Sequence, residues 1–524
     1  MRTRAVALVL VVLAACGGNG ADAPQTAQEA VPLPENQQTL TVATPGDVYI
    51  TRDRIFLGIW PDNAGVCETL VGLGYDFQPT PVLATRWTYR GDNTFRFELR
   101  RDVRFHNGAP LNAEAVRYSI NRVVEKRQTL NTFIGPESTR VVDEYTVDIT
   151  PTQPNLRLPE QIAHPFFSVV ATGTDPAERP VCTGPFTFGS YSPNDRLVVN
   201  RNDAYWGEDK AKLRQITFRF IPDQNTRRLA LESGEVDLVW FLAPQQTADV
   251  RARPGLQVAP APPGAVVDIS LNLHGEGQYT LLQDIEVRRA LALSLDPRAL
   301  GQQQWQGNAQ PVAGVSPPAV LGTAASTVRP HLTDVGQARR ILDSRGWREG
   351  SDGIREKDGR KLSLVGTAQF DFEPESLQFL QAQAKRVGID LRLQRAPDAA
   401  AYSATINSGE WDVDVNYYNQ NDANPVRIPA QFWYSKVNNA RVRLTNPGAK
   451  FDALVDEALA ATDLLTAQRK AAEAINVLVN EEAAAIALTN FPQIYAHKTS
   501  VAGFSPHPSV NHQPWTAVFR TGTT

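Results

Sequence analysis

Aromatic, amide and acidic side chains gather in one stretch of the C-terminal part of the chain. The members suited to lining a binding cleft are Tyr417, Tyr418, Asp422, Phe432, Trp433 and Tyr434. Between them runs a polar segment, residues 419–425, that contains three asparagines and one glutamine. Small-molecule sites combine aromatic walls with a few well-placed polar groups. The stretch therefore predicts ligand binding.

No motif of a known catalytic site accompanies this stretch. The chain has no Gly-x-Ser-x-Gly, no Walker loop, no His-Glu-x-x-His and no Cys-x-x-Cys. Its seven histidines are scattered, and no pair has metal-ligand spacing on a helix. An enzyme would need a nucleophile or paired carboxylates that only the fold assembles. We expect a binding protein rather than an enzyme, with no cofactor and no metal.

Two segments share a strand–helix–strand pattern. In residues 389–425, alternating apolar residues precede a helix-like run that ends at Gly409, and alternation resumes through Tyr417. Residues 216–242 repeat this order, and Ser-Gly-Glu-x-Asp closes the helix in both. A crossover helix implies parallel neighbouring strands. The two units thus predict two α/β lobes, and chance similarity between ordinary units is the alternative. Ligands bind beyond the carboxyl ends of such strands, where residues 419–425 lie.

The N-terminus has the pattern of an export signal. Arg2 and Arg4 precede an apolar run over residues 5–15, which is too short for a permanent membrane span. The run ends Leu-Ala-Ala before Cys16 and resembles the lipobox of bacterial lipoproteins. That resemblance implies cleavage before Cys16 and its acylation, whereas an ordinary signal peptide is the alternative. Residues 16–38 read as a lipidated cysteine followed by a flexible tether.

Charge and cysteine content limit the remaining possibilities. The net charge is −4, and loss of Arg2 and Arg4 makes it more negative, so nucleic acid is not an expected partner. Cys67 and Cys182 are the other cysteines. In an exported protein such a pair suggests a disulfide, and two buried free thiols are the alternative.

Several separated motifs also carry a family resemblance. They are ETLVGL at 68–73, PVLATRW at 81–87, FRFELRRDVRFHNGAPLNAEAV at 95–116, CTGPF at 182–186, NRNDAYWG at 200–207 and VRRALALSLD at 287–296. They resemble, in the family's order, the extracellular solute-binding proteins of family 5, the peptide and nickel receptors of ATP-driven importers. The resemblance covers about residues 40–500.

This resemblance implies an architecture. We expect the α/β, two-lobe, periplasmic-binding-protein-like fold of type II, with an extra subdomain in the first lobe and a hinge of two crossing segments. The expected parts are a signal peptide at 1–15, a tether at 16–38, a first lobe at 39–270 with a subdomain at about 66–180, a second lobe at 271–487, and a return to the first lobe at 488–524.

The resemblance also implies a function and partners. We expect a monomeric receptor, anchored by lipid to the outer face of the cytoplasmic membrane or held in the periplasm, that delivers a small solute to the permease subunits of an ABC transporter. An oligopeptide is the first candidate ligand, and nickel or a metal chelate is the alternative within the family. A secreted hydrolase and a chaperone-like peptide holder are the alternatives from other classes.

The resemblance further suggests ligand contacts. In peptide-binding members an acidic loop residue holds the α-ammonium of the ligand, and Asp422 resembles it; the alternative is that Asp422 only caps its loop. Those members usually carry tryptophan three residues earlier, where this chain has Asn419. That departure leaves room for a non-peptide ligand. The other predicted ligand contacts are Tyr417, Tyr418, Asn419, Phe370, Asp371, Trp433 and Trp60.

Overall fold

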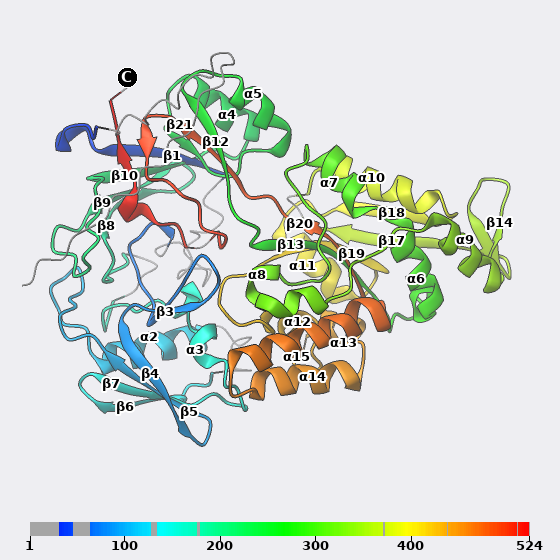
Figure 1. Cartoon of the computed structure of the whole chain (residues 1–524), viewed down its shortest axis with the longest axis horizontal. Coiled ribbons are helices and arrows are strands. Elements are labelled where there is room, and N and C mark those ends of the chain that lie inside the picture. Colours follow the sequence, from blue (N-terminus) through cyan, green and yellow to red (C-terminus); the bar gives the residue numbers. More distant parts are fainter. Residues whose placement is uncertain are drawn as a thin grey trace, which may run out of the picture.

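The structure is a computed structural model that describes residues 31–45, 63–126, 134–174, 179–369, 372–437, 439–510 and 512–522. Two lobes lie side by side, each built on its own mixed sheet (Figure 1). The predicted signal peptide, Cys16, Trp60, Phe370 and Asp371 fall outside the described residues. Within these segments, no helix is long and apolar enough to cross a bilayer.

The first lobe is built on a seven-stranded sheet with the order β12-β21-β11-β1-β10-β9-β8. The strands are β1 (Thr39–Thr44), β8 (Phe186–Ser192), β9 (Arg196–Arg201), β10 (Gln215–Phe220), β11 (Leu238–Val239), β12 (Leu256–Pro260) and β21 (Ile494–Lys498). Helices α4 (Gln224–Glu232) and α5 (Thr247–Arg251) and the short pair β22 (Val501–Ala502) and β23 (Phe519–Arg520) complete it. The C-terminal segment therefore returns to the first lobe.

The second lobe is built on a five-stranded sheet with the order β18-β17-β19-β13-β20. The strands are β13 (Ala265–Leu271), β17 (Ser363–Ala368), β18 (Asp390–Arg395), β19 (Val413–Asn419) and β20 (Ala485–Asn490), and β14 (Arg348–Glu349), β15 (Arg355–Lys357) and β16 (Arg360–Lys361) form a small separate sheet. The helices are α6 (Ile285–Ser294), α7 (Pro297–Gln304), α8 (Pro318–Leu321), α9 (Val335–Ser344), α10 (Pro374–Lys385), α11 (Ala399–Ser408), α12 (Arg427–Phe432), α13 (Ala440–Thr445), α14 (Ala449–Ala460) and α15 (Leu464–Asn476).

The two predicted strand–helix–strand units have the same design in the structure. β1 lies between β10 and β11 and runs parallel to both, and β17 lies in the same way between β18 and β19. The parallel direction is thus confirmed, whereas the prediction that the two strands are direct neighbours is wrong in both units. Asp223 and Asp398 cap the crossover helices by accepting hydrogen bonds from backbone N–H groups in the first turn. Gly409 ends α11 with a φ of 75°.

A smaller unit is inserted in the first lobe between β1 and β8. Its four-stranded sheet has the order β4-β5-β7-β6 and its own hydrophobic core. The elements are β2 (Val71–Leu73), β3 (Pro79–Pro81), β4 (Ala84–Gly91), β5 (Thr94–Leu99), β6 (Thr139–Asp143), β7 (Thr146–Ile149), α2 (Ala113–Lys126) and α3 (Leu158–Gln161). It also contacts the second lobe, because Arg157 donates from Nη2 to the Ala461 carbonyl oxygen at 3.0 Å.

The chain enters and leaves this inserted unit at a neck, where residues 67–68 lie against residues 182–183. Cys67 and Cys182 are joined there by a disulfide with Cα atoms 4.9 Å apart. Beside them the partly buried Glu68 carboxylate accepts hydrogen bonds from Thr183, Tyr205 and Trp206 at 2.7 to 2.9 Å. The resembling motifs at 68–73, 182–186 and 200–207 therefore meet at a structural junction.

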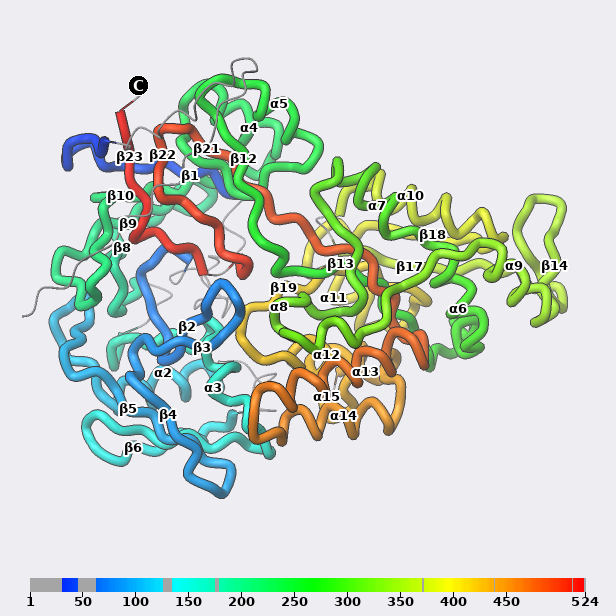
Figure 2. Tube along the Cα trace, viewed as in Figure 1, coloured from blue at the N-terminus to red at the C-terminus, as the bar shows by residue number. Residues whose placement is uncertain are grey.

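Two short segments connect the lobes. β12 ends at Pro260 and β13 begins at Ala265, while β20 ends at Asn490 and β21 begins at Ile494. The two segments run side by side between the lobes (Figure 2). Hydrogen bonds join them at both ends, from Ala261 N–H to the Gln493 carbonyl (2.8 Å) and from Phe491 N–H to the Ala265 carbonyl (3.0 Å). They form a two-segment hinge.

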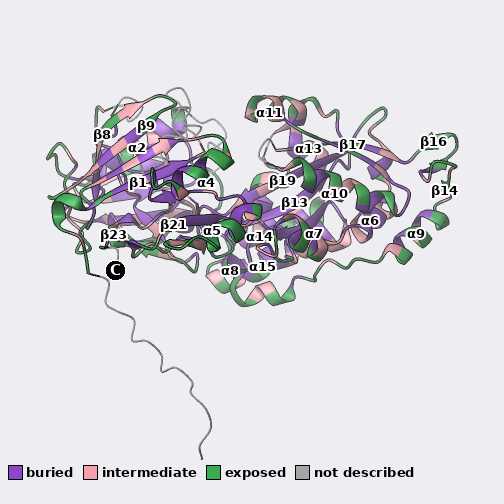
Figure 3. Cartoon of the chain, turned by 90° about the horizontal axis from the view of Figure 1, so that it is seen from above, coloured by how far each residue is buried: buried purple, intermediate pink, exposed green. Residues whose placement is uncertain are grey.

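The first crossing lies earlier than the predicted boundary after residue 270. β13 pairs along its whole length with β19, so it belongs to the second lobe. Because every residue of β13 is buried, its sequence pattern does not indicate which of the two sheets the strand belongs to. The crossing falls in residues 261–264, where Pro262 and Pro263 lack the N–H donors that a sheet needs. Buried residues concentrate in the sheets of the two lobes (Figure 3).

Candidate ligand-binding site

The polar loop after β19 lies where the two lobes meet. Gln420 N–H donates to the Gly264 carbonyl in the first crossing segment (2.9 Å), and Gln493 in the second donates to Asn419 Oδ1 (2.8 Å). Ala423 N–H donates to the Glu160 carbonyl of the inserted unit at 3.2 Å. The loop predicted from strand order thus contacts both hinge segments and the first lobe.

Neighbouring tyrosines on β19 point to opposite faces of the sheet, as strand geometry requires. Tyr417 is partly exposed and stacks on Phe491 with ring centroids 4.3 Å apart and planes at 12°. Tyr418 is 5% exposed and packs on Phe432 at 3.9 Å, and Trp433 is fully buried beside it. Tyr417 therefore lies partly exposed at the junction of the lobes, whereas Tyr418 and Trp433 lie in the interior.

The Asp422 carboxylate is engaged within its own loop. It is 2% exposed, and its Oδ1 accepts hydrogen bonds from Asn424 N–H (3.0 Å) and Gln420 Nε2 (3.1 Å). Its Oδ2 lies 3.4 Å from Arg427 Nε. Burial raises the pKa of the Asp422 carboxyl to about 7, against the opposing effect of the Arg427 charge. These contacts agree with the alternative that Asp422 caps its own loop.

Two buried amide oxygens at the junction of the lobes lack partners in the part of the chain that the structure describes. Among the described residues, Gln420 Oε1 and Gln493 Oε1 have no hydrogen-bond partner, although both side chains are at least 97% buried. Buried polar atoms are usually paired. The two oxygens are therefore unsatisfied hydrogen-bond acceptors in the described part of the chain.

A buried polar network supports the strand that carries the loop, and sequence patterns did not indicate it. Arg441 on α13 pairs with Asp414 on β19 at 2.8 Å and donates to Ser270 on β13, also at 2.8 Å. Tyr402 on α11 donates to Asp414 at 2.9 Å. The Arg441 guanidinium also lies 5.4 Å from the Tyr418 ring centroid. One face of the sheet is thereby joined to the helices that cover it.

This network contains one more buried carboxyl than its single guanidinium neutralises. Asp268 is fully buried on the same face, directly opposite Asn416, and receives a hydrogen bond only from Ser270 (3.2 Å) among the described residues. Burial, reinforced by the negative Asp414, raises the pKa of Asp268 well above its usual value despite Arg441. Asn416 Oδ1, on the residue opposite, also lacks a partner among the described residues.

Asp268→Asn should therefore stabilise the protein at neutral pH by about 1–3 kcal/mol, the usual range for satisfying a buried polar group. The unfolded Asp268 loses its proton near pH 4, and the folded one retains it at higher pH, so the native protein loses stability as pH rises through that interval. Asparagine removes this loss. Denaturant unfolding at pH 7 and at pH 4 should show a gain at pH 7 that shrinks at pH 4; an equal change at both values would contradict it.

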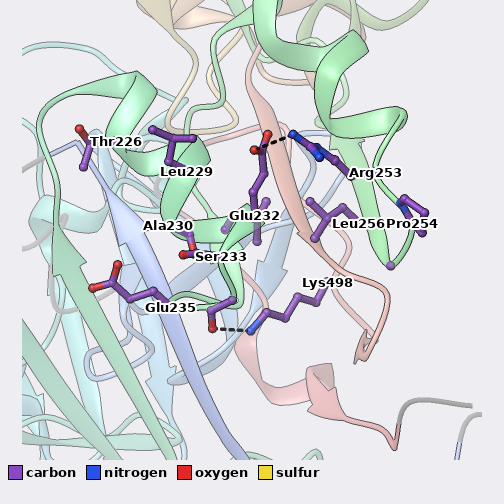
Figure 4. Close-up of a pocket in the computed structure, with 13 residues that line it drawn as sticks. Thr226, Leu229, Ala230, Glu232, Ser233, Glu235, Arg253, Pro254, Leu256 and Lys498 are labelled. Carbon is purple, nitrogen blue, oxygen red and sulfur yellow. Dashed lines mark hydrogen bonds and ion pairs between the residues drawn. The ribbon is translucent and has the colours of Figure 1, made fainter.

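Surface recesses elsewhere do not involve this loop. The one drawn in Figure 4 has a volume of about 720 Å³ and lies at the end of α4, where Glu232 faces Arg253 and Lys498 donates to the Gly234 carbonyl. A second recess, of about 620 Å³, lies along β18. Neither contains a residue of the loop at 419–424. In the described part of the chain, no three His, Cys, Asp or Glu side chains are grouped to hold a metal ion.

Two α/β lobes joined by a two-segment hinge, with a polar loop at their junction, are the architecture of a solute-binding protein. A family model described as bacterial extracellular solute-binding proteins, family 5, middle, matches residues 78–440. The chain belongs to this family. It is the substrate-binding component of an ABC transporter, works outside the cytoplasm and is not an enzyme.

Individual relatives agree with this assignment. The chain is 27% identical over 399 residues to the glutathione-binding protein GsiB of Salmonella choleraesuis, which corresponds to 70% of this chain and 75% of that protein. Two solved structures show the same fold. Helicobacter pylori DppA in complex with peptide STSA has a TM-score of 0.77 at 21% identity, covering 92% and 98% of the two chains. Brucella suis NikA in complex with Fe(III)-EDTA has a TM-score of 0.79 at 24% identity, covering 92% and 100%.

Proposed function

We propose that the protein captures a short peptide-like solute between its lobes and delivers it to membrane permease subunits. The binding residues would be those around the loop after β19, with Tyr417 as an aromatic wall and Gln420 and Gln493 as polar contacts. Acylation at Cys16 would hold the receptor, as a monomer, at the membrane surface. No bond is broken in this cycle, because binding and hinge closure are sufficient.

One observation carries the proposal: buried, unpaired amide oxygens lie at the junction of the lobes, beside a partly exposed aromatic pair. Amide oxygens accept the N–H groups that a peptide presents along its backbone, and aromatic rings pack its flat units. Relatives add support, since one is named for glutathione and a neighbour of the same fold holds a peptide. A metal chelate is the second candidate, because another neighbour holds Fe(III)-EDTA.

Native mass spectrometry of the mature protein, purified without denaturation, tests the proposal. A solute enclosed between two lobes dissociates slowly, so we expect additional mass that fragments as a peptide. Additional mass from a metal chelate would favour the second candidate. If the protein is empty, thermal unfolding with a pooled tetrapeptide library should raise the melting temperature by several degrees, as mass action requires. No shift with peptides, and a shift with chelates, would overturn the peptide assignment.

A further inference from the structure

Arg427 lies beside the acidic residue of the binding loop. It begins α12, and its side chain is 15% exposed while that of Asp422 is 3% exposed. Its Nε lies 3.4 Å from Asp422 Oδ2, and its Nη1 donates to the Asn419 carbonyl at 2.7 Å. The guanidinium thus contacts both the acidic residue and the loop backbone three residues before it, so its position is fixed by two groups.

The rest of the Asp422 carboxylate is also occupied. Its Oδ1 accepts two hydrogen bonds from the loop itself. The next acidic side chain, Glu160 of the inserted unit, is paired with Arg157 at 2.8 Å, and both are at least 90% buried. The charges at this junction therefore cancel in two internal pairs. A positively charged ligand group entering here meets no net negative charge to replace its lost hydration.

The groups that remain available are neutral. Among the described residues, Gln420 Oε1 and Gln493 Oε1 lack partners, and both are hydrogen-bond acceptors. Tyr417 and Phe491 stack face to face and are both partly exposed. Such groups can bind amide N–H donors and a flat or apolar unit. They discriminate poorly in favour of an ammonium.

We propose that Arg427 is a built-in counter-ion that takes the place of a ligand ammonium at Asp422, so that the receptor selects peptide-like solutes whose amino end is blocked or absent. The inference rests on the proposed function. Arg427 is then a specificity-determining residue.

A tetrapeptide pool prepared in two forms, with free amino ends and with N-acetylated ends, tests the selection on the mature protein. Equilibrium dialysis followed by mass spectrometry measures which form is retained. We expect the wild-type protein to retain the acetylated form at least tenfold better. Arg427→Met leaves Asp422 without its counter-ion and should shift this ratio toward the free-amine form at least tenfold. Arg392→Met, an arginine of the same lobe outside the loop, should leave the ratio unchanged.

One outcome of this experiment would contradict the inference. A tenfold wild-type preference for free-amine peptides that Asp422→Asn abolishes would overturn the inference, since Asp422 would then bind the ligand ammonium directly.

A second measurement needs no ligand. Thermal unfolding of Arg427→Met, Asp422→Asn and the double variant should show that the double variant loses less in melting temperature than the two single losses combined. Strict additivity would overturn the counter-ion assignment even if peptides bind. Non-additivity without binding of either peptide form would support the counter-ion and overturn the peptide class of the proposed function.

Discussion

Arg441→Met should lower the free energy of unfolding by about 3–5 kcal/mol, the range for removing one partner of a buried ion pair. The Arg441 side chain is 9% exposed and that of its partner Asp414 is fully buried. Loss of the guanidinium leaves two carboxyls, those of Asp268 and Asp414, in the interior without a positive charge. Methionine fills much of the volume but supplies no hydrogen-bond donors. The lost stability therefore comes chiefly from the missing charge and the missing hydrogen bonds. Denaturant unfolding followed by circular dichroism measures the effect.

The same helix provides the control. Arg443 is exposed on α13, and Arg443→Met should change stability by less than about 0.5 kcal/mol, as is usual for surface positions. Adding Asp414→Asn to Arg441→Met should recover part of the loss, because the unpaired charge is removed as well. Equal losses for the two arginine variants, or no recovery in the double variant, would show that the buried pair contributes little.

The sequence indicated the position of the polar loop after β19 because strand direction and strand ends are local properties. Alternation up to Tyr417, together with the crossover helix before it, placed the loop at a carboxyl strand end. The same alternation implies that Tyr417 and Tyr418 point to opposite faces, but which face is covered depends on α12 and α13, whose packing no local pattern specifies. The burial of Tyr418 and Trp433 therefore emerged only from the structure.

Charge pairing was the least predictable part of the site. Asp268 and Arg441 are far apart in sequence, and Arg441 reaches the sheet face that carries Asp268 only because β13 pairs with β19 and α13 contacts β13. Arg427 is close to Asp422 in sequence, yet the motif comparison drew attention to the acidic residue alone. An unpaired acidic residue in such a loop can bind a positively charged ligand group, whereas one that is paired with an arginine is already neutralised. Geometry decides between the two.

Loss of the disulfide should cost about 4–5 kcal/mol at most, the chain-entropy value for a closed loop of roughly 100 residues. Cys67 and Cys182 are separated by 115 positions, and their loop contains the whole inserted unit. We expect Cys67→Ala/Cys182→Ala to lower the melting temperature of that unit in particular. Calorimetry with and without reductant measures this, and reductant should affect the wild-type protein but not the double variant.

The neck geometry predicts how this loss is distributed. Glu68 adjoins Cys67 and Thr183 adjoins Cys182, and their hydrogen bond at 2.7 Å helps to hold the two segments of the neck together without the covalent bond. The variant should therefore still fold, with the inserted unit melting before the two sheets instead of with them. If Thr183→Val is added, that residual link is lost and the two transitions should separate further. A single, unchanged transition in all variants would mean that the disulfide does not couple the inserted unit to the first lobe.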